Sequence, residues 1–198
     1  MLKAVGQGHN TRAALIEAAF AVLREVGFAG ASARAIGDRA GINQALVFYH
    51  FGGVNQLLIA ALDRSSQARM TRYEAALAGV TDAARLLAVA WELHREDVET
   101  GHTTVLAEMA AAALSNELIR DAMAARVGAW LAFTTAVIER VLTPTPVGGL
   151  IPASAIAHGI LAMHLGADLL ARIEPDSEWI EAGFTGLGGV AGLLGSHG

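Results

Sequence analysis

Two short helical segments on either side of Gly41 constrain the fold of this chain more than any other feature of its sequence. Residues 33–40 read ARAIGDRA and follow Ser32, a residue type that commonly caps a helix N-terminus. Gly41 is placed to end that segment in the left-handed conformation, and Asn43 is placed to cap a second segment over 44–51, QALVFYHF. The FYHF ending points to every side of a helix, so only some of its rings can be buried. We therefore expect the others to face a partner.

A longer helix is predicted ahead of this pair. Apolar residues recur at helical spacing from Ala14 to Leu23, with Thr11 as the N-cap and Gly27 as the stop. The two short segments and the turn at 41–43 have the proportions of a helix-turn-helix, whose second helix enters the DNA major groove. An ordinary helical subdomain, with its rings covering a longer bundle, has the same spacing. The spacing alone leaves both interpretations open.

One face of the second short segment is expected to be buried, and the opposite face is expected to contact a partner. Val47 and Phe51 are one turn apart and are expected to pack against Ile36 and the preceding long helix. Tyr49 and His50 are then left for phosphate oxygens.

The start of the same segment carries side chains suited to base edges. Gln44 can form a bidentate pair with adenine, while Ala45 and Leu46 suit a thymine methyl group. Further anion contacts are expected from Arg34 and from the exposed amides at the Ser32 and Asn43 caps.

Residues 11–58, from TRAALIEAAF to GGVNQLL, resemble the DNA-binding region of the TetR family of bacterial transcriptional regulators without a gap. The match includes Gly27 with Phe28, Ile36, the Ala-Gly-Ile turn and the Tyr-His-Phe ending. The resemblance implies an all-α homodimer with an N-terminal helix-turn-helix domain and a larger helical domain for effector binding and dimerisation. It also implies a repressor that binds a palindromic double-stranded DNA operator and is released by a small-molecule effector.

By position, the resemblance implies two sets of DNA-contacting residues. The base-facing set is Gln44, Ala45, Leu46 and Tyr49, and the set near the backbone is Thr11, Arg34, Phe48 and His50. Three positions depart from the family pattern. Phe48 replaces a tyrosine that meets phosphate, Val54 replaces a lysine, and Leu46 replaces a small or polar residue.

The charge distribution supports a division into two domains. Residues 1–53 carry five basic and three acidic side chains, whereas residues 54–198 carry nine and sixteen. A mildly basic N-terminal unit is compatible with a polyanion, and the acidic remainder is not. We predict a DNA-binding domain over 1–53, with a flexible arm over 1–10, and a helical effector and dimerisation domain over 54–198.

The C-terminal helices combine large apolar side chains with isolated polar groups, as small-molecule sites do. The effector is therefore expected to be largely apolar. The alternative to a regulator is a helical-bundle enzyme or small-molecule-binding protein that uses His and carboxylate groups, but the sequence contains no catalytic set. No cofactor is predicted, and no metal, since His94 and His102 are too far apart for a helical pair. The candidate effector residues are Trp91, His94, His102, Met109, Trp130, Phe133 and His164.

The last two predicted helices, 153–172 and 177–194, are expected to form the dimer interface. The glycines of GFTGLGGVAGLLG would let a partner backbone approach closely. A membrane span is not expected, because Pro144, Pro146 and Pro152 interrupt the uncharged stretch before Asp168. With no cysteine and no signal peptide, the predicted location is cytoplasmic. The candidate interface residues are Leu161, Leu165, Leu169, Phe184, Leu187, Gly188, Ala191 and Gly192.

Overall fold

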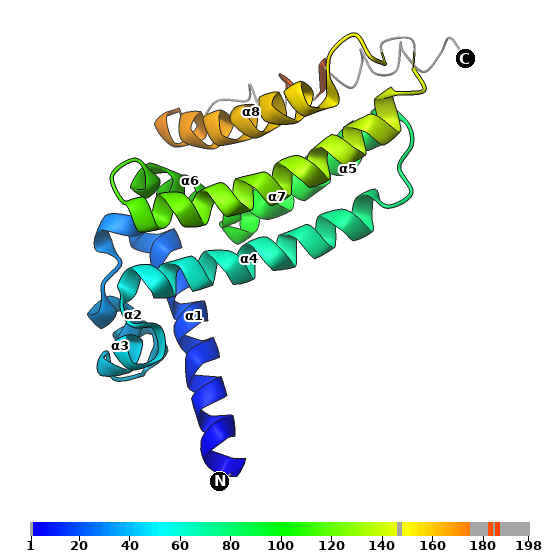
Figure 1. Cartoon of the computed structure of the whole chain (residues 1–198). Coiled ribbons are helices and arrows are strands. Elements are labelled where there is room, and N and C mark those ends of the chain that lie inside the picture. The colour runs from blue at the N-terminus through cyan, green and yellow to red at the C-terminus, as the bar shows by residue number, and fades with distance from the viewer. Residues whose placement is uncertain (1, 146–147, 175–181, 184, 187–198) are drawn as a thin grey trace. The chain divides into compact units, whose positions relative to one another are not determined.

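The computed structural model describes residues 2–145, 148–174, 182–183 and 185–186, and within these ranges the chain is all-α, as predicted (Figure 1). The helices are α1 (Leu2–Gly30), α2 (Ala33–Ala40), α3 (Ala45–Phe51), α4 (Val54–Leu77), α5 (Ala83–Thr100), α6 (His102–Ala113), α7 (Glu117–Leu142) and α8 (Ala153–Ile173).

The capping residues explain why most helices begin and end where the sequence predicts. The bounds of α2, α3 and α8 each lie within one residue of the ranges that the sequence predicts, 33–40, 44–51 and 153–172. The Asp82 carboxylate accepts a hydrogen bond from the Arg85 amide at the start of α5, at 2.7 Å. The predicted last helix, 177–194, lies outside the described residues except for 182–183 and 185–186, which are helical.

The first helix corrects the prediction. It begins at Leu2, so Thr11 lies inside α1 rather than at its N-cap, and residues 2–10 are helical rather than a flexible arm. Nothing in this segment forces a break, because it contains no proline. At the other end, Gly27 leaves the helical conformation with φ 72°, as its predicted role as a stop requires, and helical backbone resumes up to Gly30.

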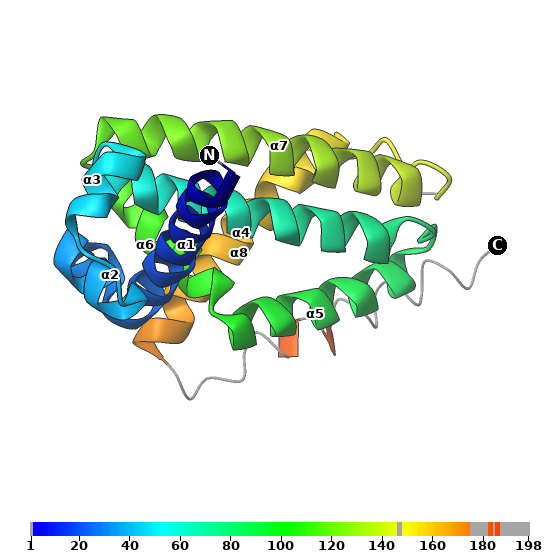
Figure 2. The same ribbon diagram turned by 90° about the horizontal axis from the view of Figure 1, so that it is seen from below.

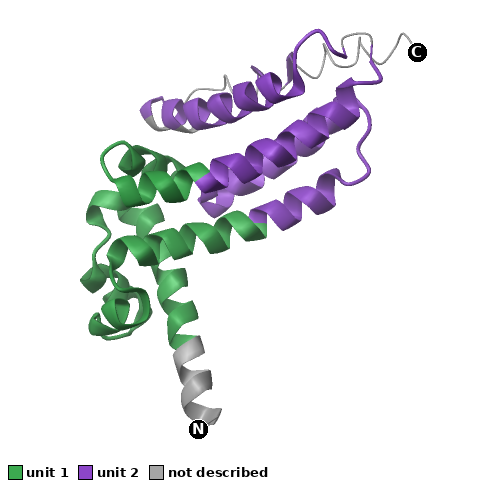
Figure 3. Cartoon of the chain, in the orientation of Figure 1, with its two compact units in different colours: residues 1–68, 104–124 green, residues 69–103, 125–198 purple. Residues whose placement is uncertain are grey.

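The chain divides into two compact units that do not follow chain order (Figure 3). The first unit comprises Met1–Ala68 and Thr104–Ala124, and the second comprises Arg69–Thr103 and Ala125–Gly198. Most of α6 and the start of α7 therefore belong with the N-terminal helices. The functional boundary between residues 53 and 54 remains a prediction.

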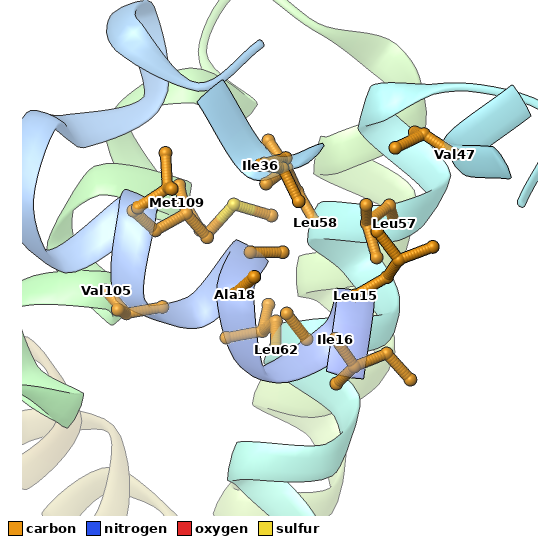
Figure 4. Close-up of a cluster of buried hydrophobic side chains, with 14 of the residues drawn as sticks. Leu15, Ile16, Ala18, Ile36, Val47, Leu57, Leu58, Leu62, Val105 and Met109 are labelled. Carbon is orange, nitrogen blue, oxygen red and sulfur yellow. The ribbon is translucent and has the colours of Figure 1, made fainter. Parts of the chain in front are cut away.

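The first unit has a continuous apolar core. In it α2 lies against α1, as Figures 1 and 2 both show. Figure 4 shows Leu15 of α1, Ile36 of α2, Leu58 of α4 and Met109 of α6 turned toward one another, and each is at most 1% exposed. Burying one such side chain stabilises a fold by about 1.5–3 kcal/mol. Helix α6 thus helps to hold the short helices in place.

The second unit has a smaller core, which includes residues of α4, α5 and α7. Arg140 of α7 closes the end of α4, because its Nε and Nη2 donate to the carbonyls of Val80 and Leu77 at 3.1 and 2.6 Å. The buried apolar residues of this core are Leu77, Val80, Val89, Leu93 and Val137.

One feature of α8 differs from the sequence analysis. The stretch Ala153–Ala171 is long and apolar enough to cross a membrane by length and composition, because the helix continues past Asp168. The pair α3 and α4, bent by 66°, passes the same test only if it is counted as one broken span. Helices of soluble proteins also meet these criteria, so they are weak evidence for a membrane.

Candidate functional site

The α2–α3 turn is built by local hydrogen bonds and one close backbone approach. Ser32 Oγ accepts from the Ala35 amide at 3.1 Å, and Gly41 takes the left-handed conformation with φ 65°. A Cβ atom on Gly37 would lie 2.7 Å from the Ile42 carbonyl oxygen. Only glycine therefore allows the turn to fold so tightly onto α2.

The buried face of α3 confirms the predicted packing. Val47 and Ile36 are both fully buried in the core of the first unit (Figure 4). Half-buried Phe51 packs against the same core. These contacts fix the rotation of α3 about its axis, because a residue one turn away from Val47 must also face the core.

The opposite face of α3 is exposed to solvent. Gln44 and Ala45 are exposed, Tyr49 is 80% exposed and Phe48 is 56% exposed. The Tyr49 and His50 rings contact each other edge to face, with centroids 4.9 Å apart. Large exposed aromatics on a short helix are typical of a binding surface.

Other predicted DNA-contacting residues have structural roles or partners within the chain. Asn43 Oδ1 accepts from the Ala45 amide at 2.9 Å, so this side chain caps α3. Leu46 is half-buried against the core, which limits its reach toward a base. Arg34 is exposed and lies 3.7 Å from Asp38 in a surface salt bridge one turn away.

A buried ionic network links α4 and α5 in the second unit. We call it the Asp97 network; its members are Arg69, Arg72, Tyr73, Glu96 and Asp97. Asp97 is fully buried and accepts from Arg69 Nε at 2.8 Å, from Tyr73 Oη at 2.9 Å and from Arg72. Burial, with the adjacent Asp97 carboxylate, raises the pKa of Tyr73 to about 12, so the phenol stays protonated and donates to Asp97.

Histidines of α5, α6 and α8 lie near this network. His94 stacks with Trp91, at 5.8 Å between ring centroids, and meets His164 edge to face at 5.3 Å. Burial lowers the pKa of His164 to about 4, and the charge of Arg69 contributes to the same shift. Burial also lowers the pKa of His94 and His102. All three imidazoles are therefore neutral at pH 7 and can donate or accept hydrogen bonds.

Two of the aromatic candidates, Trp130 and Phe133, lie next to Tyr73 of the network. Trp130 contacts Tyr73 at 5.1 Å and Phe133 at 6.0 Å between ring centroids. The guanidinium carbon of Arg69 lies 5.0 Å from the Trp130 ring centroid, so a cation of the chain itself already occupies that site.

The structure does not bring every candidate together. Met109 lies fully buried in the core of the first unit, whereas the other six effector candidates belong to the second. Of the interface candidates, Leu161 and Leu165 are half-buried and Leu169 is 57% exposed. Phe184, Leu187, Gly188, Ala191 and Gly192 lie outside the described residues.

Sequence reasoning missed the cationic side of the Asp97 network. Arg69, Arg72 and Tyr73 recur at spacings of three and four on α4, which places them on one helix face. That spacing was the available signal, but charged residues on a helix are usually solvated, and the partner Asp97 lies 24 to 28 residues away. Asp97 is a buried carboxylate three residues after His94, and its oxygens accept hydrogen bonds from Arg69, Arg72 and Tyr73.

Known proteins resemble the chain in the sequence of its N-terminal segment and in its overall fold. Residues 15–61 match the family of bacterial regulatory proteins described as the tetR family. A structure from Rhodococcus sp. has 19% identity and a TM-score of 0.78, covering 92% of this chain and 98% of its own. No curated protein matches the chain.

Two further structures share the fold. A TetR transcription regulator from Haloarcula marismortui has 23% identity and a TM-score of 0.76, covering 94% of this chain and 98% of its own. A structure from Saccharomonospora viridis in complex with choline has 19% identity and a TM-score of 0.74, covering 90% and 94%. Residues 15–61 thus match the tetR family of bacterial regulatory proteins, and the chain as a whole shares its fold with these solved structures.

Proposed function

We propose that this regulator binds a palindromic DNA operator as a homodimer and represses transcription until a small-molecule effector releases it. The exposed face of α3 is the observation that carries this proposal. Gln44, Ala45 and Tyr49 are open to solvent, while fully buried Val47 holds the opposite side of the helix. A helix fixed in this way can enter a major groove with its N-terminal side chains toward the bases.

The contacts differ in what they contribute. Gln44 pairs with an adenine edge and Ala45 meets a thymine methyl group, so these residues set sequence preference. Tyr49, His50 and Arg34 contact the phosphate backbone of the DNA. Phe48 is exposed but has no hydroxyl group, so it contributes apolar contact only. Ser32 and Asn43 act through their backbone amides, and Thr11, inside α1, is a further backbone contact.

The first test is selection of bound sequences from random duplex DNA, followed by Gln44→Ala and Tyr49→Ala on the selected duplex. Gln44→Ala removes a base contact and is expected to weaken binding by about 1–3 kcal/mol, and Tyr49→Ala should also weaken binding because it removes a contact to the DNA backbone. Circular dichroism and melting should be nearly unchanged, because both side chains are exposed. Gln67→Ala, which removes an exposed glutamine from α4, is the matched control. Wild-type affinity in both α3 variants would exclude α3 as the recognition helix.

The proposed effector site is the aromatic and histidine cluster of the second unit. Its members are Trp91, His94, His102, Trp130, Phe133 and His164. The related structure from S. viridis contains choline, a cation, but in this chain Arg69 already lies against Trp130. A largely apolar effector that accepts hydrogen bonds from neutral imidazoles suits the cluster better.

Effector release requires that DNA and effector weaken each other's binding by the same factor. Tryptophan fluorescence can identify a compound that binds, and a DNA titration at saturating compound then tests release.

We assign DNA binding to residues 1–53 and effector binding and dimerisation to 54–198. The protein is proposed to act in the cytoplasm, without a membrane, without a metal or cofactor and not as an enzyme.

A further inference from the structure

Salt bridges distinguish one arginine of the first unit from the rest. Six arginines of this unit have described side chains, and five of them lie within 4.0 Å of a carboxylate oxygen. These five are Arg24, Arg34, Arg39, Arg64 and Arg120. Arg12 forms no salt bridge with any residue that the structure describes, and it is exposed.

The Arg12 side chain lies instead at the end of α3. Its guanidinium carbon is 4.8 Å from the centroid of the Phe51 ring. Phe51 packs against the core of the first unit, so the ring is a fixed platform. The same aromatic series continues through His50, 6.5 Å from Phe51, to Tyr49, 4.9 Å from His50. The cation therefore adjoins the exposed rings of α3.

We propose that Arg12 binds a DNA backbone phosphate and that the Phe51 ring positions its guanidinium for that contact. A guanidinium that stacks on a ring through its face keeps its N–H groups directed outward in one plane. Those groups match two phosphate oxygens in a bidentate contact. An arginine already paired with a carboxylate would first have to give up that partner, whereas Arg12 does not.

Counterion release makes this proposal measurable without knowledge of the operator. Each phosphate that a protein neutralises adds about 0.9 to the slope of log affinity against log salt. The test uses the full chain and a mixed-sequence duplex of about 30 base pairs, which spans about three helical turns. Arg12→Gln should lower the slope by roughly 0.9 per bound protomer, and affinity by roughly eightfold at about 0.1 M salt.

Three further variants separate a phosphate contact from a general loss of charge or stability. Arg120→Gln removes the same charge from an arginine paired with Glu117 at 3.2 Å, so its slope should remain that of the wild type. Arg12→Lys keeps the charge and should retain most of the slope. Phe51→Leu keeps an apolar side chain but removes the ring, so it should weaken binding while Arg12 is still present. Melting temperatures identify any variant that is unfolded.

The inference rests on the proposed DNA binding, and the two can fail separately. If the wild type binds no duplex even at low salt, the proposed function and this inference are both overturned. If the wild type binds but Arg12→Gln keeps its full salt slope, only the role of Arg12 is overturned. A slope that falls equally in Arg12→Gln and Arg120→Gln would show a long-range charge effect and would also exclude the contact. An affinity unchanged in Phe51→Leu would remove the ring from the proposal.

Discussion

The break in helical backbone near the end of α1 depends on one glycine and one distant carboxylate. Gly27 has φ 72°, in the left-handed region that side chains disfavour. The next amide, that of Phe28, donates to Glu108 Oε2 of α6 at 2.9 Å. A Cβ atom at position 27 would lie 2.6 Å from the same oxygen. The position therefore excludes a side chain both through its backbone angle and through its neighbour.

Gly27→Ala is expected to lower the free energy of unfolding by about 1–3 kcal/mol, because the new methyl strains the backbone and displaces Glu108 from the Phe28 amide. Gly128→Ala is the matched control. Gly128 lies inside α7 with nothing within 4 Å of an added Cβ, so alanine there should stabilise by up to about 1 kcal/mol. Urea denaturation measures both changes. Equal effects of the two substitutions would contradict the special role of Gly27.

At the scale of elements, α4 and α5 are joined through a charge rather than only through apolar packing. Asp97 of α5 is fully buried and accepts from Arg69, Arg72 and Tyr73 of α4. The Glu96 carboxylate accepts a hydrogen bond from Arg72 Nη1 at 3.0 Å, and the Glu96 side chain is 49% exposed. Neighbouring carboxylates thus contact the same arginine at very different depths.

Asp97→Ala is expected to destabilise the protein by about 3–5 kcal/mol, because it leaves the Arg69 guanidinium buried without its counter-charge. Glu96→Gln removes a carboxylate from the solvent-exposed side of the same network and should cost less than about 1 kcal/mol. Thermal unfolding of the two variants provides the comparison. A cost for Asp97→Ala as small as that for Glu96→Gln would mean that the network contributes little to stability.

At the scale of the whole molecule, α8 exposes much of its apolar surface. Along this helix Ile160, Met163, Leu169, Leu170 and Ile173 are between 38% and 66% exposed. Exposed apolar residues that follow one another along a helix are typical of a surface that binds another protein chain. This surface supports the proposed homodimer, in which the α8 helices of two protomers meet.

Leu169→Glu should therefore convert the dimer to monomers, because a charge at a buried helix interface is costly to desolvate. Leu114→Glu is the matched control, since Leu114 is 87% exposed and lies in the first unit, outside α8. Light scattering measures the mass of each variant. Dimers of Leu169→Glu with undiminished stability would exclude Leu169 from the interface.

The sequence by itself determined the helices and the helix-turn-helix, because their signals are local. Ser32, Gly41 and Asp82 cap or end helices through atoms a few residues away, and the spacing of Ile36 and Val47 is enough to identify their buried faces. The exposed side of α3 followed from the same periodicity.

Only the tertiary structure decided which helices share a core and which charges find partners. Met109 looked like a pocket residue from its sequence neighbours, but α6 packs with the N-terminal helices and buries it there. The Glu108 contact with Phe28 spans 80 residues, and Arg12 meets Phe51 across two helices. Such contacts depend on how whole helices pack in three dimensions, and no repeat or spacing along the chain records that packing.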